Sequence, residues 1–224
     1  MDSFPERLQM MTIQLPPFII AVVLHEYAHG FIAHRWGDNT AKDAGRLTMN
    51  PIPHVDPIGT LLLPLFSMLS GINLLFGWAR PVPIDPRRFK KYRAGLFWVS
   101  FAGPLMNFLL AILSAALLCM IYLWVPQTFY LYEPLIQMAG VSIQLNYWLG
   151  IFNLLPLPPL DGSKIIQSFL SPAMTLKYES VSRYSFLILI GMMYTGVLSV
   201  LATPIHFLTQ LTFTLMATIF RLPV

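Results

Sequence analysis

The stretch from Leu96 to Val125 contains no charged side chain, and this property restricts the fold of the chain more than any other. A helix needs about 20 predominantly apolar residues to cross the hydrocarbon core of a bilayer. Of the 224 residues, 56% are hydrophobic and only 11% are charged, whereas soluble domains carry about 25% charged residues. The chain has too few charges to cover a water-facing surface. We therefore expect an all-α membrane protein, a polytopic bundle of transmembrane helices.

Five apolar segments are long enough to serve as spans, and together they predict a single transmembrane domain over residues 1–224. They cover roughly residues 13–35, 95–124, 135–155, 184–203 and 205–222. A further apolar stretch, residues 58–76, is interrupted by Pro64 and Gly71 and flanked by basic clusters on both sides. We expect it to re-enter the membrane from the cytoplasmic side or to pack against the bundle. Prolines predict an extended stretch after it, from Trp78 to Ile84.

The basic residues indicate how these spans are oriented. Nine of the 14 Lys and Arg residues lie between the first two spans, at Arg35, Lys42, Arg46, Arg80, Arg87, Arg88, Lys90, Lys91 and Arg93. Loop 126–134 contains none, and Lys164, Lys177 and Arg183 follow the third span. Since Lys and Arg concentrate in cytoplasmic loops, we expect an outside N-terminus and an inside C-terminus, in the plasma membrane. The same distribution explains the net charge of +4 without a nucleic-acid partner.

Two features that the sequence lacks narrow the class of protein further. No small-residue cleavage site follows the first apolar residues, so we expect no removable signal peptide. Cys119 is the one cysteine in the chain, which excludes an internal disulfide and a metal site built from several thiolates. A metal site in this chain would therefore use other ligands.

The first span carries three titratable side chains within five residues, His25-Glu26-Tyr27-Ala28-His29. His25 and His29 project from one helical face because they are four residues apart, and neutral imidazole is a preferred zinc ligand. Glu26 is placed to accept a proton from metal-bound water, as in the His-Glu-x-x-His signature of zinc peptidases. An ionisable group at mid-bilayer costs about 2.5–3.5 kcal/mol to insert, so a helix-packing role is disfavoured. We predict one Zn²⁺ per chain.

Two histidines leave the zinc short of one protein ligand, because catalytic zinc sites normally supply three. The candidates are His34, His54, Asp56, Glu133, Asp161, Glu179 and His206. Asp161 is favoured, since it closes a proline-broken run at the cytoplasmic end of the third span, and broken backbone at membrane depth is typical of functional sites. His54 and Asp56 lie in a loop on the same side, and position alone leaves both open.

In these motifs the chain resembles the site-2 protease family of intramembrane zinc metalloproteases. The resemblance rests on His25–His29, Asn50–Gly59, Phe76–Pro83, Gly103–Asn107 and Asn153–Gly162, which together cover most of residues 20–165. Larger members of that family carry PDZ or CBS domains, and 224 residues leave no room for them. The resemblance therefore implies a short form of the family.

The resemblance also implies roles for individual residues. Zinc would be held by His25, His29 and Asp161, with Glu26 activating the water. Asn153 would help to hold the substrate or the developing oxyanion, and a helix-packing role fits it nearly as well. Asn146 and Asn107 are weaker candidates for substrate contact, and Asn107 fits an interhelical contact equally well. The implied substrates are membrane proteins cut within a transmembrane segment, while the oligomeric state is left open. The charge pattern separately places the C-terminal ends of the first and third spans on the cytoplasmic side, so we expect the site in that half of the bilayer.

Two other functions fit the same residues. A membrane transporter would bind a transported metal ion with these histidines, and a catalytically silent relative would act as a scaffold for membrane partners. A transporter has no need of a hydrolytic glutamate, so its activity should survive Glu26→Gln, whereas peptidase activity should not. The peptidase is favoured because every expected metal and base position is filled.

Overall fold

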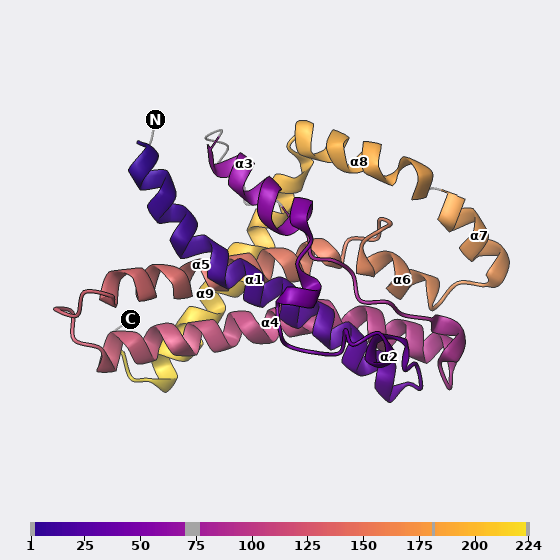
Figure 1. Ribbon diagram of the computed structural model, residues 1–224, viewed down its shortest axis with the longest axis horizontal. Helices are drawn as coiled ribbons and strands as arrows, with labels where there is room; N and C mark the ends of the chain where they lie inside the picture. The colour runs from indigo at the N-terminus through magenta and orange to yellow at the C-terminus, as the bar shows by residue number, and fades with distance from the viewer. Residues whose placement is uncertain (1–2, 70–76, 181, 223–224) are drawn as a thin grey trace.

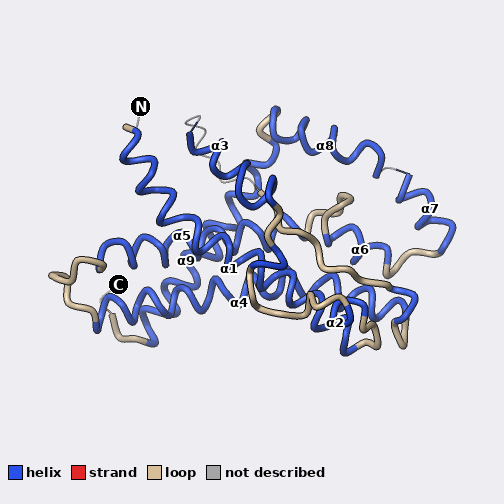
Figure 2. Tube along the Cα trace, viewed as in Figure 1, coloured by secondary structure: helices blue, strands red, loops and turns tan. Residues whose placement is uncertain are grey.

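The computed structural model describes residues 3–69, 77–180 and 182–222, and within these ranges the chain forms helices and loops without a strand (Figure 2). In the part of the chain that the structure describes, three helical segments are long and apolar enough to cross a membrane: α1 (Phe4–Arg35), α4 (Tyr92–Trp124) and the continuous helix Val197–Ile219, formed by η4 (Val197–Leu201) and α9 (Ala202–Ile219). The prediction of an all-helical, polytopic membrane protein is confirmed.

The remaining helical segments are shorter. They are α2 (Thr40–Asp43), η1 (Ile52–His54), η2 (Pro57–Leu62), α3 (Leu63–Leu69), η3 (Pro86–Arg88), α5 (Tyr132–Asn153), α6 (Asp161–Gln167), α7 (Pro172–Ser180) and α8 (Ser182–Tyr194). With 22 residues, α5 extends about 33 Å and can cross a hydrocarbon core of about 30 Å. It is less apolar than the other long helices because it includes Gln137, Gln144 and Asn146.

The boundary between the last two predicted spans lies elsewhere than the sequence suggested. Residues 184–203 do not form one helix, because α8 ends at Tyr194 and Gly196 adopts a φ of +72°. Glycine tolerates this left-handed conformation and commonly ends helices for that reason. Residues 197–203 join the last helix instead, in which Pro204 occupies the first turn of α9, a position where proline is tolerated.

The proposed re-entrant segment, residues 58–76, falls partly outside the described residues, because 70–76 are not among them. Its first part is helical: η2 is a π-helical turn whose N-terminus is capped by Asp56, which accepts hydrogen bonds from the backbone N–H groups of Ile58 (3.0 Å) and Gly59 (2.7 Å). Re-entry into the membrane stays a prediction. Trp78–Ile84 is free of helix, as its prolines predicted.

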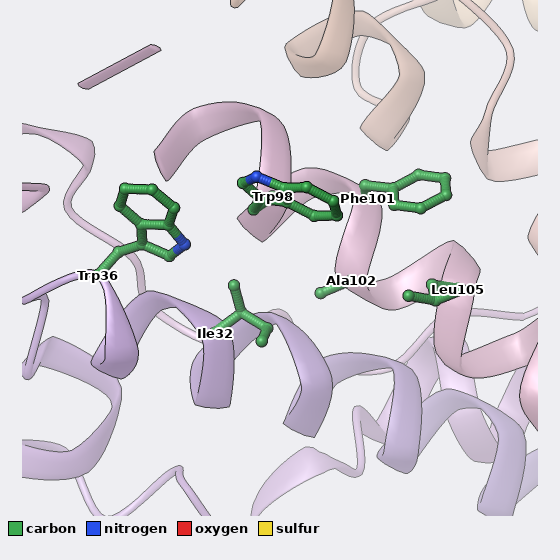
Figure 3. A pocket seen from close by; sticks show the side chains of 6 residues that line it. All are labelled: Ile32, Trp36, Trp98, Phe101, Ala102 and Leu105. Carbon is green, nitrogen blue, oxygen red and sulfur yellow. The ribbon is translucent and has the colours of Figure 1, made fainter. Parts of the chain in front are cut away.

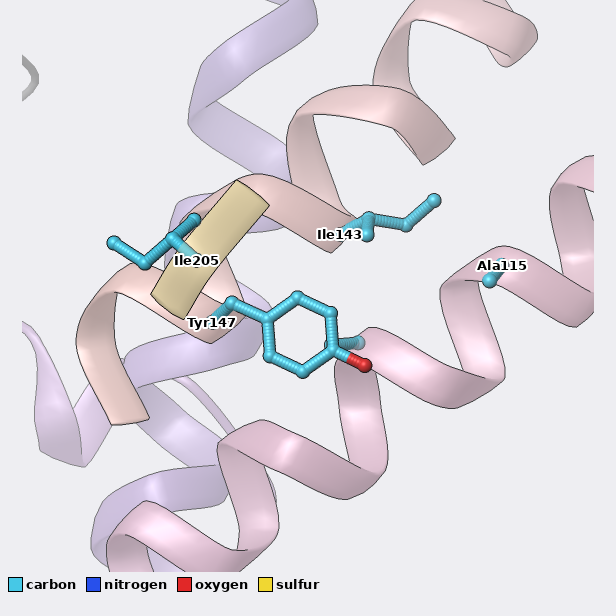
Figure 4. Packing of buried hydrophobic residues seen from close by; sticks show 5 residues of the cluster. Ala115, Ile143, Tyr147 and Ile205 are labelled. Atoms are coloured by element: carbon cyan, nitrogen blue, oxygen red, sulfur yellow. The ribbon is translucent and has the colours of Figure 1, made fainter. Parts of the chain in front are cut away.

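The centre of the molecule is made by α1, α4 and α5, with α6 packed on α4, and α9 packed on both α4 and α5 (Figure 1). A buried cluster joins α4, α5 and α9 (Figure 4) and consists of Ala111, Ala115, Ile143, Tyr147 and Ile205. The two alanines let α5 approach α4 closely, as small residues do between membrane helices. The helices α7 and α8 lie beside this core (Figure 1).

The outer faces of the long helices carry large apolar side chains. Ile20, Leu113, Phe207 and Ile219 are all more than half exposed. Soluble monomers rarely expose contiguous apolar surface on this scale. These faces therefore suit contact with lipid, and the chain is an integral membrane protein.

Candidate metal centre

The helix α1 carries His25 and His29 into the interior of the bundle, where the two residues are 9% and 6% exposed. Both lie well inside the helix. His25 precedes Arg35, the last residue of α1, by ten positions, or about 15 Å along the helix axis. The rings contact α4 near Gly103, which follows the first residue of α4 by eleven positions, or about 17 Å. The site thus lies at a similar distance from the C-terminal end of α1 and from the N-terminal end of α4.

Gly103 makes the space in which the two imidazole rings meet. A Cβ atom at this position would lie 2.4 Å from Nε2 of His29 and 2.6 Å from Nε2 of His25. Side chains cannot approach so closely without moving, so only glycine allows α4 to lie directly against both rings. The sequence marked Gly103 only as the first residue of the motif Gly103–Asn107.

Asp161 reaches the histidines from the start of α6. The helix α5 ends at Asn153, and the chain then turns back on itself through a proline-rich segment. The turn is tight at Gly162, where a Cβ atom would lie 2.2 Å from the carbonyl oxygen of Leu154. As a result, Oδ2 of Asp161 lies 3.2 Å from Nε2 of His25 and 3.3 Å from Nε2 of His29.

Within the described ranges, His25, His29 and Asp161 are the one group of three or more His, Cys, Asp or Glu residues arranged to hold a metal ion. The two Nε2 atoms are 3.0 Å apart. Nδ1 of His29 lies 2.6 Å from the carbonyl oxygen of Val99, which can only accept, so this nitrogen carries the proton. In a neutral ring Nε2 then presents a lone pair. Two imidazole nitrogens and a carboxylate oxygen form a donor set that fits zinc.

Glu26 lies next to this group and is held by a loop that crosses α1. The loop, residues 77–85, is here called the strap. The backbone N–H of Val82 donates to Oε2 of Glu26 over 2.7 Å. Val82 stands between Pro81 and Pro83, which have no N–H to offer. Its side chain packs on α1, because a Cβ atom at Gly30 would lie 3.1 Å from Cγ1 of Val82.

Hydrogen bonds on both sides fasten the strap. The guanidinium of Arg46 donates to the carbonyl oxygen of Arg80 over 2.8 Å, and the N–H of Asp85 donates to Oδ2 of Asp38 over 2.7 Å. Arg87 donates to the carboxylate of Asp85, and these hydrogen bonds hold the pKa of Asp85 below its ordinary value. The strap is therefore fixed beside Glu26 by contacts to several parts of the chain.

Four of the other sequence candidates for the third ligand are engaged elsewhere. His54 Nε2 faces the carbonyl oxygen of Thr48 at 2.9 Å, and Asp56 caps η2. His34 pairs with Asn39, and Glu133 accepts a hydrogen bond from Gln137. The structure brings Asp161 to the histidine pair, and it does not bring His54 or Asp56 there.

Asn153 lies at the C-terminal end of α5 and is partly buried. Its side-chain amide donates to the carbonyl oxygen of Leu149 over 2.9 Å, a contact within the same helix. The expected role of Asn153 toward a substrate stays a prediction.

Asn107 and Asn146 lie deeper in the bundle and closer to the histidines than the sequence indicated. They are 0% and 1% exposed, and Asn107 contacts the His25 ring directly. The sequence signal for them was weak, because an asparagine in a membrane helix can equally serve helix packing.

An apolar hollow of about 240 Å³ lies between α1 and α4 (Figure 3). It is lined by Ile32, Trp36, Trp98, Phe101, Ala102 and Leu105. Ile32 and Trp36 follow His29 by three and seven positions, so they continue the helical face that carries the histidines. Ala102 precedes Gly103. The hollow therefore opens beside the metal centre, toward the C-terminal end of α1.

Comparison with known proteins finds similarity to zinc metalloproteases, which is consistent with a zinc-binding donor set. The sequence model of peptidase family M50 matches residues 127–196, a segment that includes Asp161 and lies after the histidines. "Putative zinc metalloprotease YwhC" of Bacillus subtilis is 39% identical over 189 residues, covering 84% of this chain and 83% of the relative. "Putative zinc metalloprotease Rip2" of Mycolicibacterium smegmatis is 28% identical over 185 residues, 81% of this chain and 66% of the relative.

The protein of the same name from Mycobacterium tuberculosis is 33% identical over 160 residues, which is 69% of this chain and 56% of that relative. No solved structure matches the chain significantly.

Proposed function

The chain belongs to peptidase family M50, the site-2 protease family of membrane metalloproteases, and from this premise we propose that it cleaves its substrates inside the bilayer. The proposed reaction is hydrolysis of peptide bonds within transmembrane segments of membrane proteins. We propose that residues 1–224 form a single transmembrane protease domain for this purpose.

The observation that carries the proposal is the meeting of three buried ligand atoms at mid-helix depth. Nε2 of His25, Nε2 of His29 and Oδ2 of Asp161 lie within 3.0–3.3 Å of one another. We propose that they hold one zinc ion per chain. When bound, zinc supplies a Lewis acid that polarises a carbonyl and activates water near neutral pH.

Glu26 is the proposed general base. It would take a proton from the attacking water and return it to the leaving amine. The Val82 N–H occupies Oε2 of Glu26 and thereby orients the carboxylate, which leaves Oε1 to receive the proton. A base held in one orientation loses less freedom when the reaction begins.

We propose that the substrate lies between the strap and the hollow. A transmembrane helix hides its carbonyl groups in hydrogen bonds, so it must unwind before attack, and an unwound segment can pair with an extended one as an added strand. The strap contains no helix and lies beside Glu26, where it could serve as such a partner. The apolar hollow between α1 and α4 would accept a substrate side chain, and Asn153 would hold the substrate backbone.

The proposed orientation places the site in the cytoplasmic half of the plasma membrane. The loops that join α1 to α4 and follow α5 hold most of the Lys and Arg residues, and such loops favour the cytoplasm. Products released from this half of the bilayer would enter the cytosol.

Metal analysis combined with a cleavage assay tests the proposal. The purified wild type and Glu26→Gln should each contain one zinc per chain, and both are incubated with a panel of transmembrane helices. Cleavage by Glu26→Gln should fall by roughly 10²–10⁴-fold, the contribution of a general base. Glu133→Gln is a matched control, because Glu133 contacts Gln137 at the opposite end of the bundle from the site. Unchanged cleavage by Glu26→Gln would refute the mechanism, and metal transport that survives in this variant would indicate a carrier.

A further inference from the structure

Two asparagines lie in the middle of the bundle behind the metal centre. Asn107 is on α4 and Asn146 is on α5, and they are 0% and 1% exposed. A buried polar side chain costs free energy unless its donors and acceptors are paired. At the depth of a membrane span water is scarce, so the pairing has to come from the protein itself.

The two side chains form a continuous hydrogen-bonded path to His25. Oδ1 of Asn107 lies 2.6 Å from Nδ1 of His25. Nδ2 of Asn107 donates to Oδ1 of Asn146 over 2.9 Å. Nδ2 of Asn146 in turn donates to the backbone carbonyl oxygen of Ser142 over 2.9 Å. The path thus runs from α5 through α4 to α1.

The direction of every bond in this path follows from its end point. The carbonyl oxygen of Ser142 can only accept, so the amide nitrogen of Asn146 must face it. Oδ1 of Asn146 then faces Asn107, which must present its own amide nitrogen. The carbonyl oxygen of Ala21, 3.5 Å from Nδ2 of Asn107, favours the same orientation. Oδ1 of Asn107 is left to face His25 as an acceptor.

An acceptor at Nδ1 determines which nitrogen of the His25 ring bears the proton. With Nδ1 protonated, the neutral ring has its lone pair on Nε2, the atom that faces His29 and Asp161. His29 reaches the same state more simply, because its Nδ1 faces the carbonyl oxygen of Val99 at 2.6 Å. The two histidines thus have equivalent tautomers imposed by different partners.

We propose that Asn107 and Asn146 are positioning residues that hold His25 in its metal-binding tautomer and orientation. This assignment rests on the proposed metal site. Partners of this kind typically change metal affinity or activity by about 10–100-fold when they are removed. Asn107 acts directly on the ring, and Asn146 acts only by orienting Asn107.

The first test measures the zinc dissociation constant of the purified full-length protein. Asn107→Leu should weaken zinc binding by about 10–100-fold, and Asn146→Leu should weaken it less. The double variant should bind zinc no more weakly than Asn107→Leu alone, because the effects of residues in one network are not additive. Asn107→Asp keeps an oxygen acceptor opposite Nδ1 and should recover part of the lost affinity.

Ser114→Ala is the matched control for helix packing. Oγ of Ser114 contacts Oγ of Ser142 at 2.7 Å, so this variant also removes a hydrogen bond between α4 and α5. It leaves in place both Ser142 acceptors of Asn146, the carbonyl oxygen and Oγ. Its zinc affinity should equal that of the wild type. If Ser114→Ala loses as much affinity as Asn107→Leu, or if Asn107→Leu loses none, the assignment is wrong.

A second readout does not depend on zinc. ¹⁵N NMR of metal-free protein with labelled histidine, at a pH where the rings are neutral, reports which nitrogen of His25 is protonated. The wild type should show the proton on Nδ1, and Asn107→Leu should show a shift toward Nε2. A wild type that binds no zinc would refute the proposed function, while an unchanged tautomer in Asn107→Leu would refute the positioning role.

Discussion

Replacing Gly103 with alanine adds one methyl group at the point where α4 lies against both imidazole rings. The new Cβ atom would be 2.4 Å from Nε2 of His29, whereas an ordinary contact begins at about 3.4 Å. Either the ring or the helix must therefore move by about 1 Å. The atoms in the way are the nitrogens proposed to bind the metal, so the displacement would fall directly on the proposed ligands.

The size of the expected effect follows from that displacement. Metal–ligand distances in working sites stay within about 0.2 Å of their preferred values, so a shift of about 1 Å separates a ligand from the ion. A misplacement of about 1 Å at a catalytic group can cost about 10²-fold in rate, which corresponds to about 2.7 kcal/mol. Zinc content should fall together with cleavage.

The assay compares Gly103→Ala with Gly140→Ala in zinc content, cleavage rate and thermal stability. Gly140 lies inside α5, and a Cβ atom there would meet nothing within 4 Å. Alanine is favoured over glycine within a helix by about 0.5–1 kcal/mol, so the control should be as stable as the wild type or slightly more so, with full activity. If Gly103→Ala binds zinc and cleaves substrate like the wild type, the close packing of α4 against the two rings is refuted.

Three further predictions concern the turn that carries Asp161, the metal and the role of Asn153. Gly162→Ala should reduce zinc content and lower the melting temperature, because its Cβ would lie 2.2 Å from the Leu154 carbonyl oxygen; equal zinc content in the variant would contradict this. Removal of zinc by a chelator should lower the free energy of unfolding. The loss should be about 2.7 kcal/mol if the free zinc concentration was 100 times the dissociation constant before removal. Calorimetry with and without added zinc measures this loss. Asn153→Ala should slow cleavage while zinc content stays at one per chain, and an unaltered rate would remove Asn153 from the substrate-binding role.

Local sequence patterns were sufficient for much of the fold. Apolar length and the low share of charged residues predicted a helical membrane protein, because the cost of placing charge or unpaired backbone in lipid is large. The boundary near Gly196 was misplaced, since hydropathy does not reveal where one apolar helix ends and the next begins. The backbone conformation of that glycine ends α8.

The sequence by itself determined that His25 and His29 share a helical face, since a spacing of four residues has the same geometry in every α-helix. It also favoured Asp161 over the other candidates for third ligand. Only the tertiary structure decided that Asp161 meets those histidines, that Gly103 leaves space for them, that Val82 orients Glu26, and that Asn107 and Asn146 reach the back of His25. Each of these contacts joins residues far apart in the chain, and their distances depend on how whole helices pack, which short-range periodicity does not specify.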